Sequence, residues 1–480
     1  MPETSLDGTP VRRSGQMGAF ELAFFVVAAA GPLLVVVGYT PIAFMVGGVG
    51  APGAQLAAGL VLLFFAVGLT RMALRIDNAG AFYAYIGRAF GRIPGAGSAA
   101  LASGSYAVIT VAEVIVIGYF ASVLIPSVPW WAFSLLAWAI IAVISHHQIS
   151  ISAKVLGVAL ASEAGILLIL AVAILVIGGP EGVDLHSFKP SSIFAGNSTG
   201  AMFAVVFGAF LGFESTAIYT EEARDPRRTV PRAIYLAIGF LGVFYTFVAW
   251  TIYLAYGRSE IVLAAVTDPA GLVFGALEIY VGPWAVLLCE ILIVISAFAS
   301  ALAFHNTAIR YLHTLGREGL LPTKLARVHP THGSPSSANV VLALFTLIVV
   351  LGAALLQVED PYLNLFIPVV SAGVVGLLTS QAVCALAIVF YFGFVDRTHQ
   401  LSLWSTLIAP AIGFLGLASA VYLTVRNFDV LSGQSLAVNI ALLSWLPILT
   451  LIGLIRALVM RSSNPAAYAR LTQTNVYQNH

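Results

Sequence analysis

The sequence predicts an all-helical, polytopic membrane protein with about twelve transmembrane helices. Of its 480 residues, 60% are hydrophobic and only 9% are charged, whereas a soluble domain carries about 25% charged residues to cover its surface. Long apolar runs follow one another along the whole chain. The basic residues collect in every second loop between these runs. The lipid bilayer is therefore the natural solvent of this chain.

Twelve apolar runs are candidates for membrane spans, because a helix needs about 20 apolar residues to cross the hydrocarbon core. They lie near residues 18–49, 54–74, 97–124, 130–145, 150–178, 199–222, 231–256, 283–312, 337–356, 362–392, 403–425 and 435–459. The stretches between them are short, the longest being the loop around 313–336 and the two tails. We therefore expect no soluble domain, and any chemistry must take place within the helix bundle.

The basic residues predict how the spans are oriented. With a cytoplasmic N-terminus, only Lys189, Arg258 and Arg426 of the 22 basic residues fall outside, and the other 19 fall inside. Membrane proteins show this bias in their short loops. The sequence thus predicts a multi-pass protein of the cytoplasmic membrane with both termini in the cytoplasm. The net charge of +1 argues against a nucleic-acid partner.

Two of the predicted spans contain helix-breaking residues, and these spans lie five apart in the chain. Gly31–Pro32 and the stretch from Gly38 to Pro41 interrupt the first span, and Gly208 and Gly212 interrupt the sixth. Backbone that leaves a helix exposes polar groups that lipid cannot satisfy. Secondary transporters with two inverted five-helix repeats place their binding site at such breaks. The alternative is that these residues are packing contacts or simple kinks, which are common in membrane helices.

This reading divides the chain into a cytoplasmic tail, two repeats, two further helices and a second tail. The predicted boundaries are 1–16 for the N-terminal tail, 17–178 for repeat 1, 179–198 for an extracellular loop, 199–392 for repeat 2, 403–460 for spans eleven and twelve, and 461–480 for the C-terminal tail.

The breaks predict where a small solute would bind. The N-terminus of a half-helix favours a carboxylate, and the C-terminus of a half-helix favours an ammonium group. Spans one, three and six supply the candidate substrate-binding residues, which are Ala30, Gly31, Pro32, Leu33, Gly38, Tyr106, Glu113, Phe207, Gly208, Phe210 and Gly212.

Four glutamates lie well inside spans, and no lysine or arginine lies comparably deep; the four are Glu113, Glu163, Glu214 and Glu290. A charge inside the membrane costs at least about 2.5 kcal/mol and is a functional candidate for that reason. A carboxyl group can lower this cost by taking up a proton, as a proton carrier must. The alternative is a neutral acid that caps a half-helix or bonds to a neighbouring helix.

Three segments resemble the amino acid–polyamine–organocation transporters, a likeness that runs from about Glu21 to about Phe392. They are NAGAFYAYIGRAFG (Asn78 to Gly91), GFESTAIYTEEARDPRRTVPRAI (Gly212 to Ile234) and FHNTAIRYLHTLGREGLLP (Phe304 to Pro322). The resemblance implies the five-plus-five inverted repeat of the bacterial leucine transporter, with discontinuous first and sixth spans and two extra C-terminal helices. It also implies transport of amino acids or amines, driven by protons or by exchange.

The resemblance also implies roles for two of the acids. Glu214 stands where the family carries a glutamate linked to proton sensing and gating. Near Glu163, some proton-coupled relatives have a lysine that replaces a sodium ion against spans one and eight. A glutamate there would cycle a proton in the same way, with Ser296 and Ser300 as neighbours. We therefore predict that Glu163, Glu214, Ser296 and Ser300 serve proton coupling and gating.

The chain departs from the family pattern at two places. Typical members carry Gly-Ser-Gly or Gly-Thr-Gly in span one, where the backbone holds the substrate's carboxylate. Here the segment from Ala28 to Pro41 reads AAAGPLLVVVGYTP. The aromatic gate that some members place six residues before the span-six glutamate is replaced by Gly208, so Phe207 or Phe210 would have to serve.

Other classes of protein fit less well. An intramembrane enzyme would need a metal site or a catalytic dyad, but His146 and His147 are adjacent and His305 and His313 lie too far apart to chelate. A channel would need a filter built by oligomer symmetry. A sensor that moves no substrate stays open as an alternative. We expect neither a cofactor nor a metal.

The sequence thus predicts a secondary active transporter of amino acids that works by alternating access and is coupled to protons. The alternative is a transporter or exchanger of polyamines, other amines or basic amino acids. The sequence does not distinguish uptake from exchange and does not set the oligomeric state.

Overall fold

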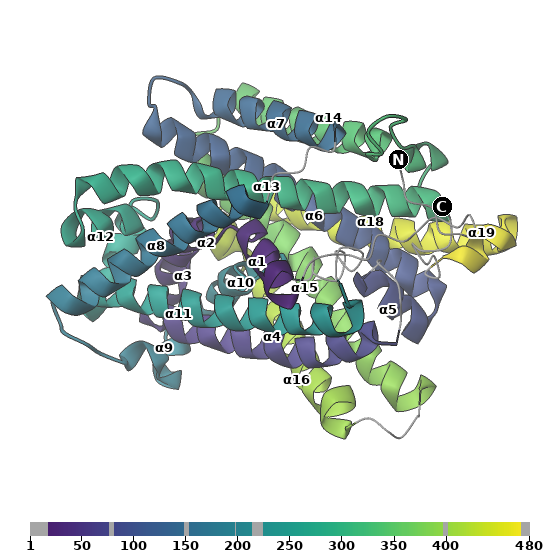
Figure 1. Ribbon diagram of the computed structural model, residues 1–480, viewed down its shortest axis with the longest axis horizontal. Coiled ribbons are helices and arrows are strands. Elements are labelled where there is room, and N and C mark those ends of the chain that lie inside the picture. Colours follow the sequence, from purple (N-terminus) through teal and green to yellow (C-terminus); the bar gives the residue numbers. More distant parts are fainter. Residues whose placement is uncertain are drawn as a thin grey trace, which may run out of the picture.

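The computed structural model describes residues 18–75, 81–147, 153–196, 198–213, 224–396 and 402–471. In these ranges ten helical segments are long and apolar enough to cross a membrane, and two shorter apolar helices, Trp130–His146 and Thr199–Gly208, accompany them. Together they correspond to the twelve predicted spans. Most of them run side by side along the long axis of the molecule (Figure 1).

The first five spans begin with an interrupted helix. Span one consists of α1 (Ala19–Ala29), α2 (Pro32–Gly38) and α3 (Thr40–Gly47), and η1 (Gly48–Gly50) leads into α4 (Ala51–Ala73). The short helix α5 (Ala81–Phe90) precedes α6 (Arg92–Leu124), which is followed by α7 (Trp130–His146) and α8 (Ala153–Ile177). The connection to span six contains η2 (His186–Phe188) and α9 (Pro190–Ile193).

The second half of the chain repeats the pattern of an interrupted span followed by continuous ones. Its helices are α10 (Thr199–Gly208), α11 (Pro226–Thr267), α12 (Leu272–Tyr280), α13 (Pro283–Glu318), η4 (Thr323–Ala326), α14 (Ser336–Leu355) and α15 (Ile367–Phe390). The π-helical turns η5 (Tyr362–Phe366) and η6 (Tyr391–Val395) flank α15. The last two spans are η7 (Trp404–Ile408) with α16 (Ala409–Arg426), and α18 (Leu436–Ser463), accompanied by the short helices α17 (Phe428–Ser432) and α19 (Pro465–Arg470).

Two predicted span boundaries differ from the structure because a membrane helix continues past the hydrocarbon core. The third span begins at Arg92 rather than near residue 97. The eighth ends at Glu318 rather than at 312, where Gly319 adopts the left-handed conformation (φ 82°) that commonly stops a helix. The seventh span, predicted to end near 256, does end there, because Gly257 (φ 77°, ψ 165°) leaves the helical conformation and α11 contains a second helical stretch after this kink.

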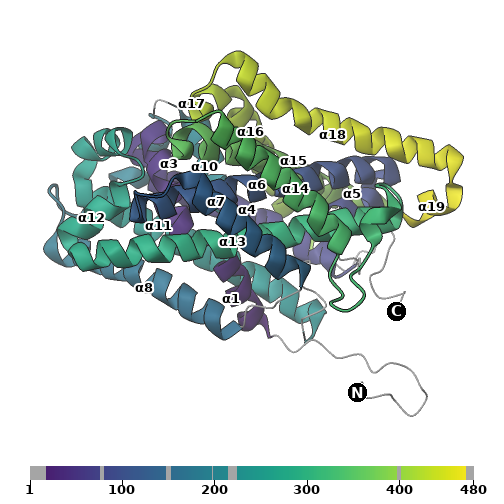
Figure 2. The same cartoon turned by 90° about the horizontal axis from the view of Figure 1, so that it is seen from above.

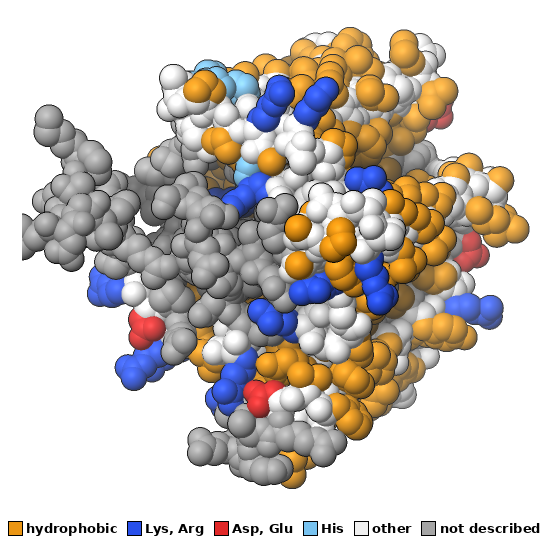
Figure 3. All heavy atoms as spheres, turned by 90° about the vertical axis from the view of Figure 1, so that its right-hand side faces the viewer, with side chains coloured by type: hydrophobic (Ala, Val, Ile, Leu, Met, Phe, Trp, Pro, Cys, Tyr) orange, Lys and Arg blue, Asp and Glu red, His pale blue; other side chains and the backbone are white. Residues whose placement is uncertain are grey.

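Basic side chains lie at one end of the long axis (Figure 3). One end carries α5 and α19, and the other carries α9 and α12 (Figure 1). Figure 3 looks at the α5–α19 face and shows Lys and Arg side chains scattered over it. Arg71, Arg88, Arg317 and Arg461 stand in the last turns of helices that end there. The predicted cytoplasmic orientation of this face stays a prediction.

The interrupted helix lies at the centre of the bundle. All residues of α2 are buried, and α2 packs against α8, α11 and α13. In contrast, α18 runs along the outside (Figure 2), and only 11% of its apolar stretch is buried. Such an all-round apolar, exposed helix is suited to face lipid.

Candidate functional site

Span one breaks at Ala30–Gly31, where the sequence forbids a continuous helix. Pro32 has no N–H to continue the hydrogen-bond ladder of α1, and Gly31 adopts a left-handed conformation (φ 61°, ψ 66°). A Cβ atom at this position would lie 3.2 Å from the Ser296 carbonyl oxygen and 3.2 Å from the Ser300 Cβ. Glycine therefore permits both the turn and the close approach of α13.

The start of α2 is held by a carboxylate from α8 and a hydroxyl from α13. The Leu33 N–H donates to Glu163 Oε2 at 3.2 Å, and the Leu34 N–H donates to Ser296 Oγ at 3.3 Å. The Ser296 hydroxyl in turn donates to Glu163 Oε2 at 2.8 Å. Glu163 and Ser296 are both buried. We call these three bonds the α2 clamp, since they tie spans one, five and eight together.

A second break separates α2 from α3 at Tyr39. The Tyr39 hydroxyl lies 3.5 Å from Glu113 Oε1 on α6 and donates to it. The carbonyl oxygen of Gly38, which the break leaves without a helical partner, accepts a hydrogen bond from the Tyr362 hydroxyl at 2.7 Å. Polar groups released by the break are thus satisfied inside the bundle, as lipid requires.

The first half of span six ends beside the break in span one. Helix α10 stops at Gly208, and turns follow as far as Gly212, whose φ of 109° only glycine adopts easily. A Cβ atom at Gly208 would lie 3.1 Å from Val374 Cγ2 and 3.8 Å from the Tyr39 ring. Glu214, predicted to serve gating, lies outside the described residues.

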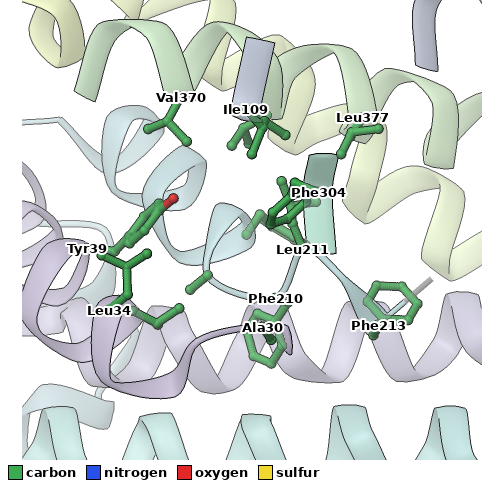
Figure 4. Packing of buried hydrophobic residues seen from close by; sticks show 14 of the residues in the cluster. Ala30, Leu34, Tyr39, Ile109, Phe210, Leu211, Phe213, Phe304, Val370 and Leu377 are labelled. Atoms are coloured by element: carbon green, nitrogen blue, oxygen red, sulfur yellow. The ribbon is translucent and has the colours of Figure 1, made fainter. Parts of the chain in front are cut away.

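A small cavity lies where these breaks meet α6, α13 and α15. Its lining consists of Ala30, Leu34, Val35, Tyr39, Ile109, Glu113, Gly208, Ala209, Leu211, Ser300, Phe304 and Val370. Several of these side chains converge on one space in Figure 4. In this conformation the cavity has room for about one water molecule. It must widen to hold an organic solute.

Glu113 is the charged group of the described lining. Its side chain is 2% exposed, and its Oε2 atom has no hydrogen-bond partner among the described residues. A buried acceptor without a partner costs about 1–3 kcal/mol, and more when it is charged. Such an atom in a cavity points to a ligand that donates a hydrogen bond.

Aromatic side chains cover the cavity on both sides along the long axis. Toward the α9–α12 face, Tyr362 stacks on Tyr119 and on Phe366 with ring centroids 5.3 and 5.8 Å apart, and Tyr39 meets Phe366 edge-on. We call this group the α9-side aromatic layer.

Toward the α5–α19 face, Tyr106 lies 5.3 Å from Tyr311 and 6.1 Å from Phe304. Tyr83 of α5 packs against Tyr311 at 6.1 Å, and its hydroxyl donates to Glu318 Oε1 at 3.2 Å. We call this group the α5-side aromatic layer. The cavity therefore lies between two aromatic layers.

The predicted site residues fall into three groups. Ala30, Glu113, Gly208 and Ser300 line the cavity. Gly31, Pro32, Leu33, Gly38, Glu163 and Ser296 surround it at the breaks and in the α2 clamp. Tyr106, Phe207, Phe210 and Gly212 are not part of the lining.

The two aromatic candidates of span six point elsewhere. Phe207 packs against Phe203 with centroids 6.3 Å apart, and Phe210 meets Tyr245 edge-on at 6.0 Å. Gly208, Ala209 and Leu211 face the cavity instead. The gating role expected of Phe207 or Phe210 stays a prediction.

Most of the apolar lining was not predicted from the sequence. Ile109 lies one helical turn before Glu113, and Phe304 lies one turn after Ser300. Residues four apart share a helix face, so this spacing was the available signal. Tyr39, inside the predicted break, is the polar residue that was missed.

The fold and the site define this chain as an all-helical membrane protein of the LeuT fold. Two solved structures show the likeness. MhsT in complex with L-phenylalanine has a TM-score of 0.55 and 17% identity, covering 83% of this chain and 98% of that one. A Na⁺-coupled sialic acid symporter in its substrate-bound outward-open state has a TM-score of 0.50 and 13% identity. The match covers 86% of this chain and 90% of the symporter chain. The predicted fold class is confirmed.

The chain belongs to the amino acid permease family, whose model matches residues 17–454. This is a family of transporters rather than enzymes, and it lies within the superfamily that the sequence motifs indicated.

Curated relatives match parts of the chain. An uncharacterised transporter of Mycobacterium tuberculosis is 32% identical over 138 residues, which are 29% of this chain and 30% of the relative. The low-affinity putrescine importer PlaP of Escherichia coli is 23% identical over 301 residues, which are 61% of this chain and 64% of PlaP. The branched-chain amino acid permease BcaP of Bacillus subtilis is 25% identical over 174 residues, 36% of each chain. These matches span less than two thirds of each relative's length.

Proposed function

We propose that this permease carries a small organic molecule with an ammonium group, an amino acid or an amine, across the cytoplasmic membrane. The observation that carries the proposal is the Oε2 atom of Glu113, which has no hydrogen-bond partner among the described residues and lies in the cavity between the broken spans. An ammonium group would supply the missing hydrogen bond and neutralise the buried charge. Amino acids and amines share this group.

Alternating access is the mechanism that the two aromatic layers favour. The contracted cavity must open to one face at a time, through the α9-side layer on one side and the α5-side layer on the other. The breaks at Gly31 and Gly212 supply hinges between half-helices, and a glycine hinge tolerates large dihedral changes. Spans one, two, six and seven would rock as a bundle against the remaining helices.

Proton coupling is assigned to Glu163, with Glu214 as a second candidate outside the described residues. As a carboxylate, Glu163 accepts hydrogen bonds from both Leu33 and Ser296 on one oxygen. Protonation removes most of its attraction for these donors and loosens the α2 clamp. Proton binding would thereby release α2 from α8 and α13, and the state of the clamp would set which face the cavity opens to.

An amine is the second candidate substrate, and one observation favours it over an amino acid. The described lining contains an acid but no lysine, arginine or histidine to hold a carboxylate. The putrescine importer PlaP, which matches 61% of this chain, is named for such a substrate. Localisation in the cytoplasmic membrane with both termini inside is supported by the basic side chains of the α5–α19 face (Figure 3).

The test is uptake of radiolabelled amino acids and amines into proteoliposomes, with and without an inward proton gradient. Gradient-driven accumulation of at least one compound would support the proposal. Flux that requires a counter-substrate but no proton gradient would show that the protein is an exchanger rather than a proton symporter. No binding and no flux across the panel would overturn the transport function.

A further inference from the structure

The backbone N–H groups at the break in span one are all in use. Those of Ala30, Gly31 and Val35 bond to the carbonyl oxygens of Val26, Ala28 and Gly31 at 3.0, 3.3 and 3.1 Å. Pro32 has no N–H group. The two remaining donors, on Leu33 and Leu34, are taken by Glu163 and Ser296. The half-helix that would attract an anion is therefore already capped by the protein's own carboxylate.

The described lining of the cavity offers no partner to a substrate carboxylate. Burying an ionised carboxylate is strongly unfavourable unless donors or a cation compensate it. The described lining offers no cationic side chain, and its one acid, Glu113, would repel a second carboxylate. The hydroxyls of Tyr39 and Ser300 are the polar groups left, and Tyr39 already donates to Glu113.

We infer that Glu163 is a built-in replacement for the substrate's carboxylate, so that the transported molecule is an amine without a carboxylate. The inference rests on the proposed function and narrows it to one class of substrate. The cationic nitrogen pairs with Glu113. The rest of the molecule contacts the apolar part of the lining, which includes Leu34, Ile109, Leu211, Phe304 and Val370.

The binding test uses pairs of molecules that differ by a carboxylate alone. Phenethylamine is compared with phenylalanine, isoamylamine with leucine, and putrescine with ornithine, by competition and direct uptake in proteoliposomes of the full chain. We expect at least one amine to bind and its parent amino acid to bind at least about 100-fold more weakly, because the carboxylate would be buried unpaired. Amino acid amides, which keep the amine and lose the charge, should bind closer to the amine.

A change of specificity is the second readout. In Glu163→Ala the Leu33 N–H loses its resident carboxylate, so the ratio of amino acid to amine binding should rise at least about tenfold. Ser296→Ala leaves the Glu163 carboxylate in place and should leave the ratio near the wild-type value. Glu290→Gln, on the same helix as Ser296, is the control for loss of an acid elsewhere in span eight.

The outcomes separate this inference from the proposed function. If an amino acid binds as well as its decarboxylated partner, the inference is wrong, while transport of ammonium compounds stands. If no compound binds or is transported, both the proposed function and this inference are wrong. If Glu163→Ala does not fold, the comparison of each amine with its parent amino acid on the wild-type protein still tests the inference.

Discussion

Ser296 donates a hydrogen bond to Glu163 at 2.8 Å, and the same carboxylate oxygen accepts the Leu33 N–H of the broken helix. One buried carboxylate therefore joins α8, α13 and the start of α2. This junction matters because α2 belongs to the span whose break forms the cavity. A group that both holds the half-helix and can be protonated links the protonation state to the position of that half-helix.

Replacing Glu163 with glutamine should uncouple transport from the proton gradient. Glutamine keeps the size of the side chain and an oxygen that can accept the two hydrogen bonds, but it cannot take up or release a proton. We expect uptake against the concentration gradient to be lost while downhill exchange persists. The measurement is accumulation in proteoliposomes at several imposed proton gradients, with Glu290→Gln as the control. Accumulation that still follows the gradient would remove Glu163 from the coupling mechanism.

Replacing Glu113 with glutamine should weaken substrate binding. A hydrogen bond to a charged group contributes about 1.5–3 kcal/mol, which corresponds to roughly 10- to 150-fold in affinity. Equilibrium binding of a labelled amine to the purified variant measures this loss. The companion Tyr39→Phe removes the hydroxyl of the described residues that bonds to Glu113 and should have a smaller effect. An unchanged affinity in Glu113→Gln would place the ammonium site elsewhere.

The sequence was sufficient to predict the features that local chemistry controls. Gly31–Pro32 breaks a helix in any surroundings, since proline lacks the donor and glycine permits a left-handed turn. The depth of Glu163 and of Ser296 in the membrane could likewise be predicted by counting residues from the ends of their spans. These two residues were named as neighbours from their depths and from the family resemblance.

Other features depend on how the helices are rotated and packed, which one sequence does not specify. Phe207 and Phe210 were expected in the site, yet Gly208 at the end of α10 and Leu211 in the turns after it line the cavity instead. Composition alone gave no sign of this, because the whole helix is apolar and has no polar face to orient it.

Alanine at position 31 should disable the break in span one. Gly31 has a φ of 61°, and its Cβ would approach Ser296 and Ser300 of α13 at 3.2–3.3 Å. The left-handed conformation costs an alanine about 1–2 kcal/mol, and the contact adds to this. We expect a lower thermal unfolding temperature and reduced transport.

Gly165 offers a matched control for this substitution. It lies in α8, and a Cβ there would meet nothing within 4 Å, so Gly165→Ala should be neutral or stabilising by up to about 1 kcal/mol. Thermal unfolding followed by size-exclusion chromatography of the two variants makes the comparison. Equal effects at positions 31 and 165 would contradict the proposed role of the Gly31 turn.

Loosening either aromatic layer should open the cavity to one face only. Ser300→Cys places a thiol in the lining, and the native Cys289 and Cys384 are buried, so background labelling should be low. Tyr362→Phe removes the bond to the Gly38 carbonyl oxygen. A hydrogen bond contributes about 1 kcal/mol net, so the open population should rise about fivefold.

The two layers give opposite expectations for a membrane-impermeant thiol reagent. Tyr362→Phe should increase labelling of Ser300→Cys from the outside of intact cells. Tyr83→Phe, which removes the bond to Glu318, should increase it only in inside-out vesicles. Labelling that rises from both sides in either variant would argue against two separate closures.

A cluster of four histidines should make the stability of the protein depend on pH. His146 and His147 at the end of α7 face His329 and His332 of the loop before α14, with ring centroids 4.6–5.3 Å apart. Desolvation and the neighbouring imidazoles lower the pKa of His329 below 6.5. Its neutral Nδ1 atom also accepts hydrogen bonds from the N–H groups of Thr331 and His332.

The sign of the effect follows from the lowered pKa. The folded protein resists protonation of His329 more than the unfolded chain does, so its contribution to stability is complete above pH 6.5 and is lost as the pH falls through the lower, folded-state value. We expect the thermal unfolding temperature to decrease between pH 7.5 and pH 5.5. In His329→Gln the decrease should be smaller, whereas His186→Gln, in η2 away from the cluster, should keep the wild-type slope. Equal slopes in wild type and His329→Gln would mean that protonation of this cluster does not govern the acid response.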